Sequence, residues 1–221
     1  MIYNATNKLF QNDSVIQYIK DKEFKRVLDI GGANNPWAKE VVTHYLDLNK
    51  PNIDDAVFIK GDICNPKTWN NLINNEEHFD FIICTQTLED VRDPIQALTF
   101  MPVIANEGYL SVPTKFRELD LVEGYGPYEQ REWGIIGAYR GYFHHRWIFT
   151  VRNDELVLFP KLCIVNIMKG LEWALSHAGE YSELSFFWKD DIPFKIINDD
   201  FMGPHGPAVL EMFRTQLEEG L

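Results

Sequence analysis

The chain has 221 residues, of which 45% are hydrophobic, and this suits one globular domain with a core of its own. Asp and Glu number 33 against 21 Lys and Arg, giving a net charge of −12 without any run of basic residues, so nucleic acid and anionic membrane surfaces are disfavoured as partners. The three cysteines form no CxxC pair and the N-terminus has no signal-peptide pattern, so we expect a cytoplasmic protein with reduced thiols and no metal site.

The first half alternates strand-like and helix-like segments. Helices are expected at about 13–20, 66–74 and 94–106. Asn65 and Asp93 each precede a proline, a pattern typical of a helix N-cap followed by its first residue. Strands are expected at 26–30, 43–47, 57–60, 79–84 and 108–112. Strands that alternate with helices in this way predict a parallel sheet with crossover helices.

The second half follows a different pattern. Glycines, aromatics and charges are mixed over 114–142, which predicts a long loop or a partly helical insertion after the fifth strand. Two hairpins are expected, the first pairing 147–151 with 156–159 and the second pairing 183–188 with 193–197. Helices are expected at 164–178 and at about 207–219.

These elements predict an α/β fold with a Rossmann-like, doubly wound and mostly parallel sheet. The sheet is expected to end in a C-terminal antiparallel hairpin and to carry an insertion after strand five. We expect a single domain over residues 1–221, with the insertion or cap at about 114–160.

A nucleoside site is indicated where the first strands end. The sequence Val-Leu-Asp-Ile-Gly-Gly-Ala-Asn-Asn-Pro over 27–36 leads from a buried strand into small residues, which permit a sharp turn and close approach of a ligand. Asp47 ends the second strand, where a carboxylate accepts hydrogen bonds from ribose hydroxyls. Asp62 and Ile63 follow the third strand, where they would meet the amine and ring of adenine. Each feature taken alone also fits an ordinary turn or strand end.

The fourth strand continues into a longer motif. Phe79-Asp80, Leu88-Glu89 and Asp93-Pro94 match the pattern FDxVxxxxxLEHxxDP of one large family. The segment Asn-Glu-Gly-Tyr-Leu-Ser-Val-Pro over 106–113 is similar to the GGxLxxSVP strand that follows in that family. With the glycine turn, these residues resemble the class I S-adenosylmethionine-dependent methyltransferases, in particular the small-molecule methyltransferase type 11 group.

The resemblance covers about 25–114, with a weaker similarity at 145–150. It implies that S-adenosylmethionine is the cofactor, with Asp29 and the glycine-loop backbone facing its methionine part. Asp47 would hold the ribose, and Thr85 with Gln86 would line the sulfonium side. The implied cofactor-binding residues are Asp29, Gly31, Gly32, Ala33, Asp47, Leu48, Asp62, Ile63, Thr85 and Gln86.

Three positions depart from the family pattern. Ala33 and Asn35 replace the second and third glycines of its GxGxG turn, and Asp90 replaces the histidine after Leu-Glu. These changes leave open a non-catalytic protein of the same fold that acts as a binding or scaffold module. An NAD-dependent oxidoreductase also uses a glycine turn and an acid after the second strand, but the Leu-Glu…Asp-Pro segment does not belong to it.

An oxygen acceptor needs a base to take its proton, and the candidates are His144 and His145, because histidine titrates near neutral pH. In an extended chain their rings point to opposite sides, so at most one faces the site. A structural role for both is the alternative. Aromatic residues of the insertion, such as Tyr125, Tyr128 and Trp133, would form a lid or simply pack. The acidic charge favours a small-molecule acceptor, such as a sugar or nucleotide-linked sugar, over nucleic acid.

Overall fold

The computed structural model describes residues 2–6, 12–50, 55–122, 139–142, 144–162, 165, 183–197, 211 and 215. The chain divides into two compact units. The first unit consists of Met1–Asn4, Lys8–Val112 and Ser185–Pro193, and the second consists of Ala5–Asn7, Pro113–Leu184 and Phe194–Leu221. The single domain expected over 1–221 stays a prediction.

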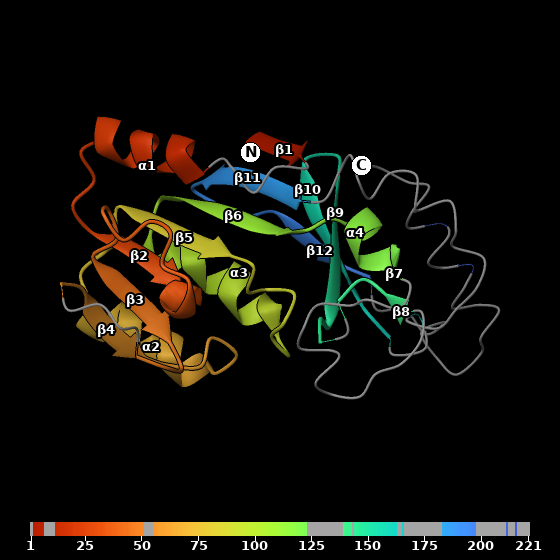
Figure 1. The fold of residues 1–221 in the computed structure, drawn as a ribbon. Helices are drawn as coiled ribbons and strands as arrows, with labels where there is room; N and C mark the ends of the chain where they lie inside the picture. The colour runs from red at the N-terminus through yellow and green to blue at the C-terminus, as the bar shows by residue number, and fades with distance from the viewer. Residues whose placement is uncertain are drawn as a thin grey trace. The chain divides into compact units, whose positions relative to one another are not determined.

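A seven-stranded sheet forms the first unit, with the order β1-β11-β6-β5-β2-β3-β4 (Figure 1). Its strands are β1 (Ile2–Thr6), β2 (Val27–Ile30), β3 (His44–Asp47), β4 (Val57–Lys60), β5 (Phe81–Thr85), β6 (Glu107–Pro113) and β11 (Glu183–Lys189). The strands from β2 to β6 pair in parallel with their neighbours. The Asp190 N–H, just after β11, donates to the carbonyl of Asn106, just before β6, at 2.6 Å, so β11 runs antiparallel to β6.

Helices cover both faces of this sheet (Figure 1). Helix α1 (Asn12–Asp21) buries Val15, Ile16 and Ile19 against one face. Helix α2 (Pro66–Asn75) packs on the other face, where Thr68 lies beside the side chain of Leu46 over Gly61, and the stacked rings of Trp69 and Phe100 join it to α3 (Pro94–Ile104). This arrangement confirms the predicted doubly wound α/β fold.

The expected N-caps of α2 and α3 are both formed. The side chain of Asn65 accepts a hydrogen bond from the Lys67 N–H at 3.0 Å, and the side chain of Asp93 accepts one from the Ile95 N–H at 3.1 Å. Each cap satisfies a backbone donor that the first helical turn leaves without a partner. The cap and the proline after it therefore fix where each helix begins, as the sequence predicted.

The last strands pair differently from the expected hairpin. β11 lies between β1 and β6, whereas β12 (Phe194–Ile196) pairs in parallel with β10 (Glu155–Pro160). The predicted pairing of 183–188 with 193–197 is therefore wrong, although both segments are strands. A period-2 pattern marks a strand but does not identify its partner. The sequence also gave no indication of β1.

The second unit contains a three-stranded sheet of order β12-β10-β9. β9 (Trp147–Arg152) and β10 form the predicted antiparallel hairpin, and Asn153 and Asp154 at its turn both have positive φ, as a type I′ hairpin turn requires. The remaining elements are the short helix α4 (Lys115–Leu119) and the paired strands β7 (Leu121–Val122) and β8 (Tyr139–Arg140).

Several predicted elements lie outside the described residues. They are most of the helix at 164–178, most of the helix at 207–219, and the part of the insertion that contains Tyr125, Tyr128 and Trp133. Among the residues that are described, no helix has the length and apolar character to cross a membrane.

Candidate functional site

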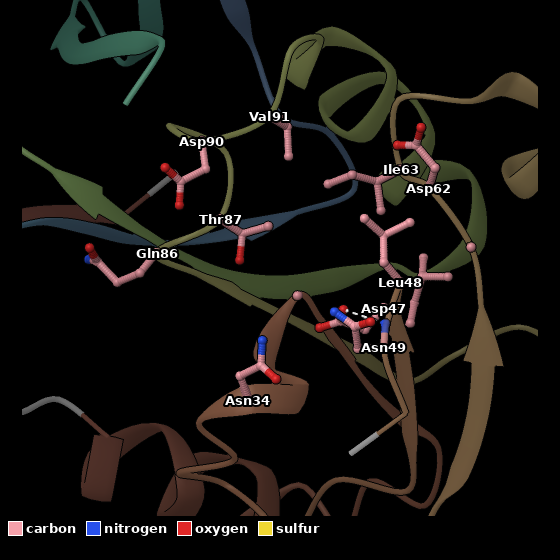
Figure 2. A pocket seen from close by; sticks show the side chains of 13 residues that line it. Asn34, Asp47, Leu48, Asn49, Asp62, Ile63, Gln86, Thr87, Asp90 and Val91 are labelled. Atoms are coloured by element: carbon pink, nitrogen blue, oxygen red, sulfur yellow. Dashed lines mark hydrogen bonds between the residues drawn. The ribbon is translucent and has the colours of Figure 1, made fainter. Parts of the chain in front are cut away.

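A pocket of about 300 Å³ lies at the carboxyl ends of the parallel strands of the first unit. The loops after β2, β3, β4 and β5 all contribute to it (Figure 2). β2 and β5 are neighbours in the sheet, but the strand that follows β2 in the chain lies on one side of this pair and the strand that follows β5 lies on the other. Ligands of open α/β sheets bind at such a switch point. The residues that line the pocket are Gly31, Asn34, Leu46, Asp47, Leu48, Asn49, Gly61, Asp62, Ile63, Gln86, Thr87, Asp90 and Val91.

The floor of the pocket is a tight turn after β2. Gly31 has φ +81°, and its N–H donates to the carbonyl of Leu46 at 3.0 Å. Residues Gly32–Asn34 then form one turn of 3-10 helix in place of a longer crossover helix. A Cβ on Gly31 would lie 2.4 Å from the Thr87 hydroxyl oxygen. A left-handed backbone and this close neighbour together require glycine at position 31.

Asp29 lies beneath this turn and does not line the pocket. Its side chain is fully buried, and in the described part of the chain neither carboxylate oxygen has a hydrogen-bond partner. Burial and, to a smaller extent, the charge of Asp47 raise the pKa of Asp29 to about 7. The backbone amide of Gly32 acts in the opposite direction, although its distance and angle do not make a hydrogen bond to the carboxylate. A Cβ on Gly32 would lie 2.1 Å from one of these oxygens, so the carboxylate requires glycine at position 32.

Asp47 ends β3 at the pocket wall with its carboxylate held by two backbone amides. One oxygen accepts from the Ala33 N–H at 3.3 Å and the other from the Asn49 N–H at 3.1 Å. An ionised carboxylate offers about four lone-pair sites, so about two remain for further donors. This arrangement fits a pair of ribose hydroxyls, which was the role predicted for Asp47.

Apolar and acidic side chains meet at one side of the pocket. Figure 2 shows Leu48 and Ile63 on the same side as Asp47 and Asp62, with Gln86 on the opposite side. Leu48 is 59% exposed, so its side chain offers apolar surface that a ligand can cover. Asp62 accepts a hydrogen bond from the Cys64 N–H at 2.8 Å. A flat, apolar ring with an amine at its edge, such as adenine, fits this side.

The loop after β5 supplies the opposite side. Gln86 has φ +48°, and its N–H donates to the carbonyl of Ser111 at 2.9 Å. The Trp37 indole N–H donates to the Thr85 hydroxyl at 3.1 Å. Gln86 therefore lines the pocket as predicted, whereas Thr85 contacts Trp37 and is absent from the lining.

His144 and His145, the candidate bases, belong to the second unit. His144 is exposed and His145 is buried, but their ring centroids lie only 4.6 Å apart. The two rings therefore do not point to opposite sides, because the backbone is not extended here and the His145 N–H donates to the carbonyl of Tyr142 at 3.4 Å. His145 Nδ1 lies 2.5 Å from Glu118 Oε1, and Glu118 Oε2 lies 2.6 Å from Lys161 Nζ. No motif in the sequence indicated this cluster, because its members come from three segments far apart in the chain.

The structure brings most of the predicted cofactor residues together. Those that line the pocket are Gly31, Asp47, Leu48, Asp62, Ile63 and Gln86. Gly32 and Ala33 are buried in the turn beside it. The pocket residues outside the predicted cofactor set are Asn34, Leu46, Asn49, Gly61, Thr87, Asp90 and Val91. Five of these seven are adjacent to a predicted residue, so counting the two or three positions around each strand end would have found them. Asp90 and Val91 lie further along the loop after β5.

Comparison with known proteins agrees with this geometry. A family model described as a methyltransferase domain matches residues 6–153. No curated protein is significantly similar in sequence. One similar solved structure is the N-terminal domain of EvdMO1 with SAH bound, at 13% identity, 82% coverage of each chain and a TM-score of 0.45.

Two further solved structures match over a shorter length. The plantazolicin methyltransferase BpumL, in complex with a pentazolic desmethylPZN analog and SAH, is 16% identical over 47% of this chain and 46% of its own, with a TM-score of 0.36. The magnesium protoporphyrin IX methyltransferase ChlM from Synechocystis PCC 6803, with bound SAM, is 14% identical over 46% of this chain and 56% of its own, with a TM-score of 0.34. These likenesses are remote, whereas the family model spans most of the chain. The chain therefore belongs to the methyltransferase-domain family, among the class I S-adenosylmethionine-dependent methyltransferases.

Proposed function

We propose that this methyltransferase modifies a small-molecule acceptor, with sugars and nucleotide-linked sugars as the favoured class. The proposal is carried by charge: the chain has a net charge of −12, and the described residues that line the pocket include Asp47, Asp62 and Asp90, of which Asp62 pairs with Arg92 at 3.5 Å. An acidic protein repels nucleic acid and other polyanions. An uncharged sugar meets no such barrier, and a nucleotide-linked sugar, with its two phosphate charges, is repelled far less than a nucleic-acid chain.

The pocket residues bind and orient the cofactor in this proposal. The carboxylate of Asp47 accepts hydrogen bonds from the ribose hydroxyls, Leu48 and Ile63 contact the adenine ring, and Asp62 accepts from its amine. Gly31 lets the backbone approach the ligand. Bound S-adenosylmethionine supplies a methyl group on positively charged sulfur, so the protein mainly has to align and desolvate the reacting groups.

His145 is the proposed base for a hydroxyl acceptor, in preference to His144. A base must hold one nitrogen ready to take a proton in a fixed orientation. His145 is buried and lies against the carboxylate of Glu118, whereas the His144 side chain is exposed. The more tightly held ring suits proton transfer better.

The test is transfer of labelled methyl from S-adenosylmethionine to a panel of hexoses and nucleotide-linked sugars, with duplex DNA and RNA alongside. We expect label in at least one sugar compound and none in nucleic acid, and Asp47→Ala should reduce the transfer. Label in nucleic acid would contradict the proposed acceptor class. Cofactor binding without transfer to any compound would favour the non-catalytic alternative.

A further inference from the structure

A cluster of buried ionisable side chains lies in the second unit. Glu118 is 0% exposed, Lys161 7% and His145 8%. Glu118 comes from α4, His145 precedes β9, and Lys161 directly follows β10. Charged groups are rarely buried unless they are paired and hydrogen-bonded. Burial of these three ionisable groups costs desolvation free energy, and packing of the three segments alone does not explain why it is retained.

Both oxygens of the Glu118 carboxylate are engaged. Oε1 contacts His145 Nδ1 at 2.5 Å, and Oε2 accepts from Lys161 Nζ at 2.6 Å. Lys161 also donates to the carbonyls of Arg140 at 3.1 Å and Tyr142 at 2.7 Å. The ammonium group therefore holds the carboxylate on one side and the backbone that leads to His145 on the other.

Glu118 is the ionised member of its contact with His145. Burial alone would raise the pKa of Glu118, but the neighbouring Lys161 and His145 outweigh burial and lower it. Burial lowers the pKa of Lys161, and Glu118 opposes that change. A carboxylate without a proton only accepts hydrogen bonds, so the proton between the two groups is the one on His145 Nδ1.

The direction of this hydrogen bond fixes the form of the imidazole. When Nδ1 carries the proton of a neutral ring, Nε2 carries the lone pair. The plane of the ring is also held by Tyr142, whose ring centroid lies 4.6 Å away with an interplanar angle of 30°. Gly141, just before it, has φ +53° and would meet the Glu118 carbonyl oxygen at 2.3 Å if it had a Cβ, so this backbone runs directly against α4.

We propose that Glu118 is a positioning residue that orients His145 with Nδ1 protonated and Nε2 as the proton-accepting nitrogen, and that Lys161 holds Glu118 in place. This inference rests on the proposed function, in which His145 is the base. Glu118 and Lys161 act only through the imidazole. A buried ion pair contributes little to the free energy of unfolding. In this proposal the Glu118–Lys161 pair is retained because it selects one tautomer of the His145 ring.

The test is nitrogen NMR of protein labelled with ¹⁵N-histidine, at a pH where the His145 ring is neutral. The wild-type His145 should show a protonated Nδ1 and an unprotonated Nε2. His145→Gln identifies the signals. His44, whose Nδ1 lies 2.8 Å from the Thr43 hydroxyl in the first unit, is the internal control. A wild-type ring protonated at Nε2 would overturn the proposal without any further variant.

The double variant Glu118→Gln/Lys161→Met removes both charges together, so that neither is left buried alone. We expect His145 to lose its single tautomer while the His44 signals and the affinity for S-adenosylhomocysteine stay unchanged. With an acceptor found in the methyl-transfer panel, kcat should fall on the order of 100-fold. An unchanged tautomer or an unchanged kcat in the folded double variant would overturn the role of Glu118. Failure of the wild type to bind S-adenosylhomocysteine would instead refute the proposed function, independently of the tautomer.

Discussion

Replacing Asp29 with asparagine is expected to stabilise the protein above neutral pH. Asp29 is fully buried without a hydrogen-bond partner among the described residues, and its pKa is raised from 3.8 to about 7. As pH rises from 3.8 to 7, the unfolded chain releases this proton while the folded chain keeps it, so the free energy of unfolding falls. At 1.36 kcal/mol per pH unit, the loss reaches about 4 kcal/mol above pH 7. Asparagine has no titrating proton, so the variant does not lose this stability as pH rises.

The measurement is urea unfolding of the wild type and Asp29→Asn at about pH 5 and pH 8. The stability of the variant relative to the wild type should grow by roughly 3 kcal/mol between the two. Any constant effect of the asparagine amide cancels in this comparison. Asp13→Asn removes an exposed carboxylate and serves as the matched control. A stability difference that is the same at both pH values would show that Asp29 has no raised pKa, and the buried-carboxylate argument would fail.

Three further substitutions test other parts of the structure. Asp47→Ala should weaken binding of S-adenosylhomocysteine by about 1–3 kcal/mol, and an unchanged dissociation constant in calorimetry would remove Asp47 from the site. Gly32→Ala places a Cβ 2.1 Å from the Asp29 carboxylate and should lower the free energy of unfolding by about 1–3 kcal/mol; adding Asp29→Ala should restore much of it. Lys161→Met strands the buried Glu118 charge and should cost about 3–5 kcal/mol, more than the double variant with Glu118→Gln, in urea unfolding.

The sequence predicted the first unit well because its signals are local. Asn65-Pro66 and Asp93-Pro94 mark helix starts through contacts two residues apart, and each parallel strand is a short apolar run between turns. Parallel strands place their carboxyl ends at one edge, so the neighbourhood of Asp47, Asp62 and Gln86 followed from the strand assignments alone.

Features that depend on distant partners could not be predicted in this way. The strand containing Phe194 pairs with Leu156, and nothing near position 194 identifies that partner. Burial of Asp29 beneath the turn, rather than in the pocket, depends on the path of the chain over Gly32. The contact of Glu118 with His145 and Lys161 joins residues up to 43 positions apart. The periodicity of a helix or a strand does not indicate contacts of this kind.

The most direct test of the account is calorimetric titration of the protein with S-adenosylmethionine and S-adenosylhomocysteine, with NAD as the control ligand. The geometry of the pocket predicts that both adenosyl compounds bind with dissociation constants on the order of 1–100 μM and that NAD does not bind in this range. Binding of NAD in preference, or binding of none of the three, would contradict the assignment of this pocket to the methyltransferase cofactor.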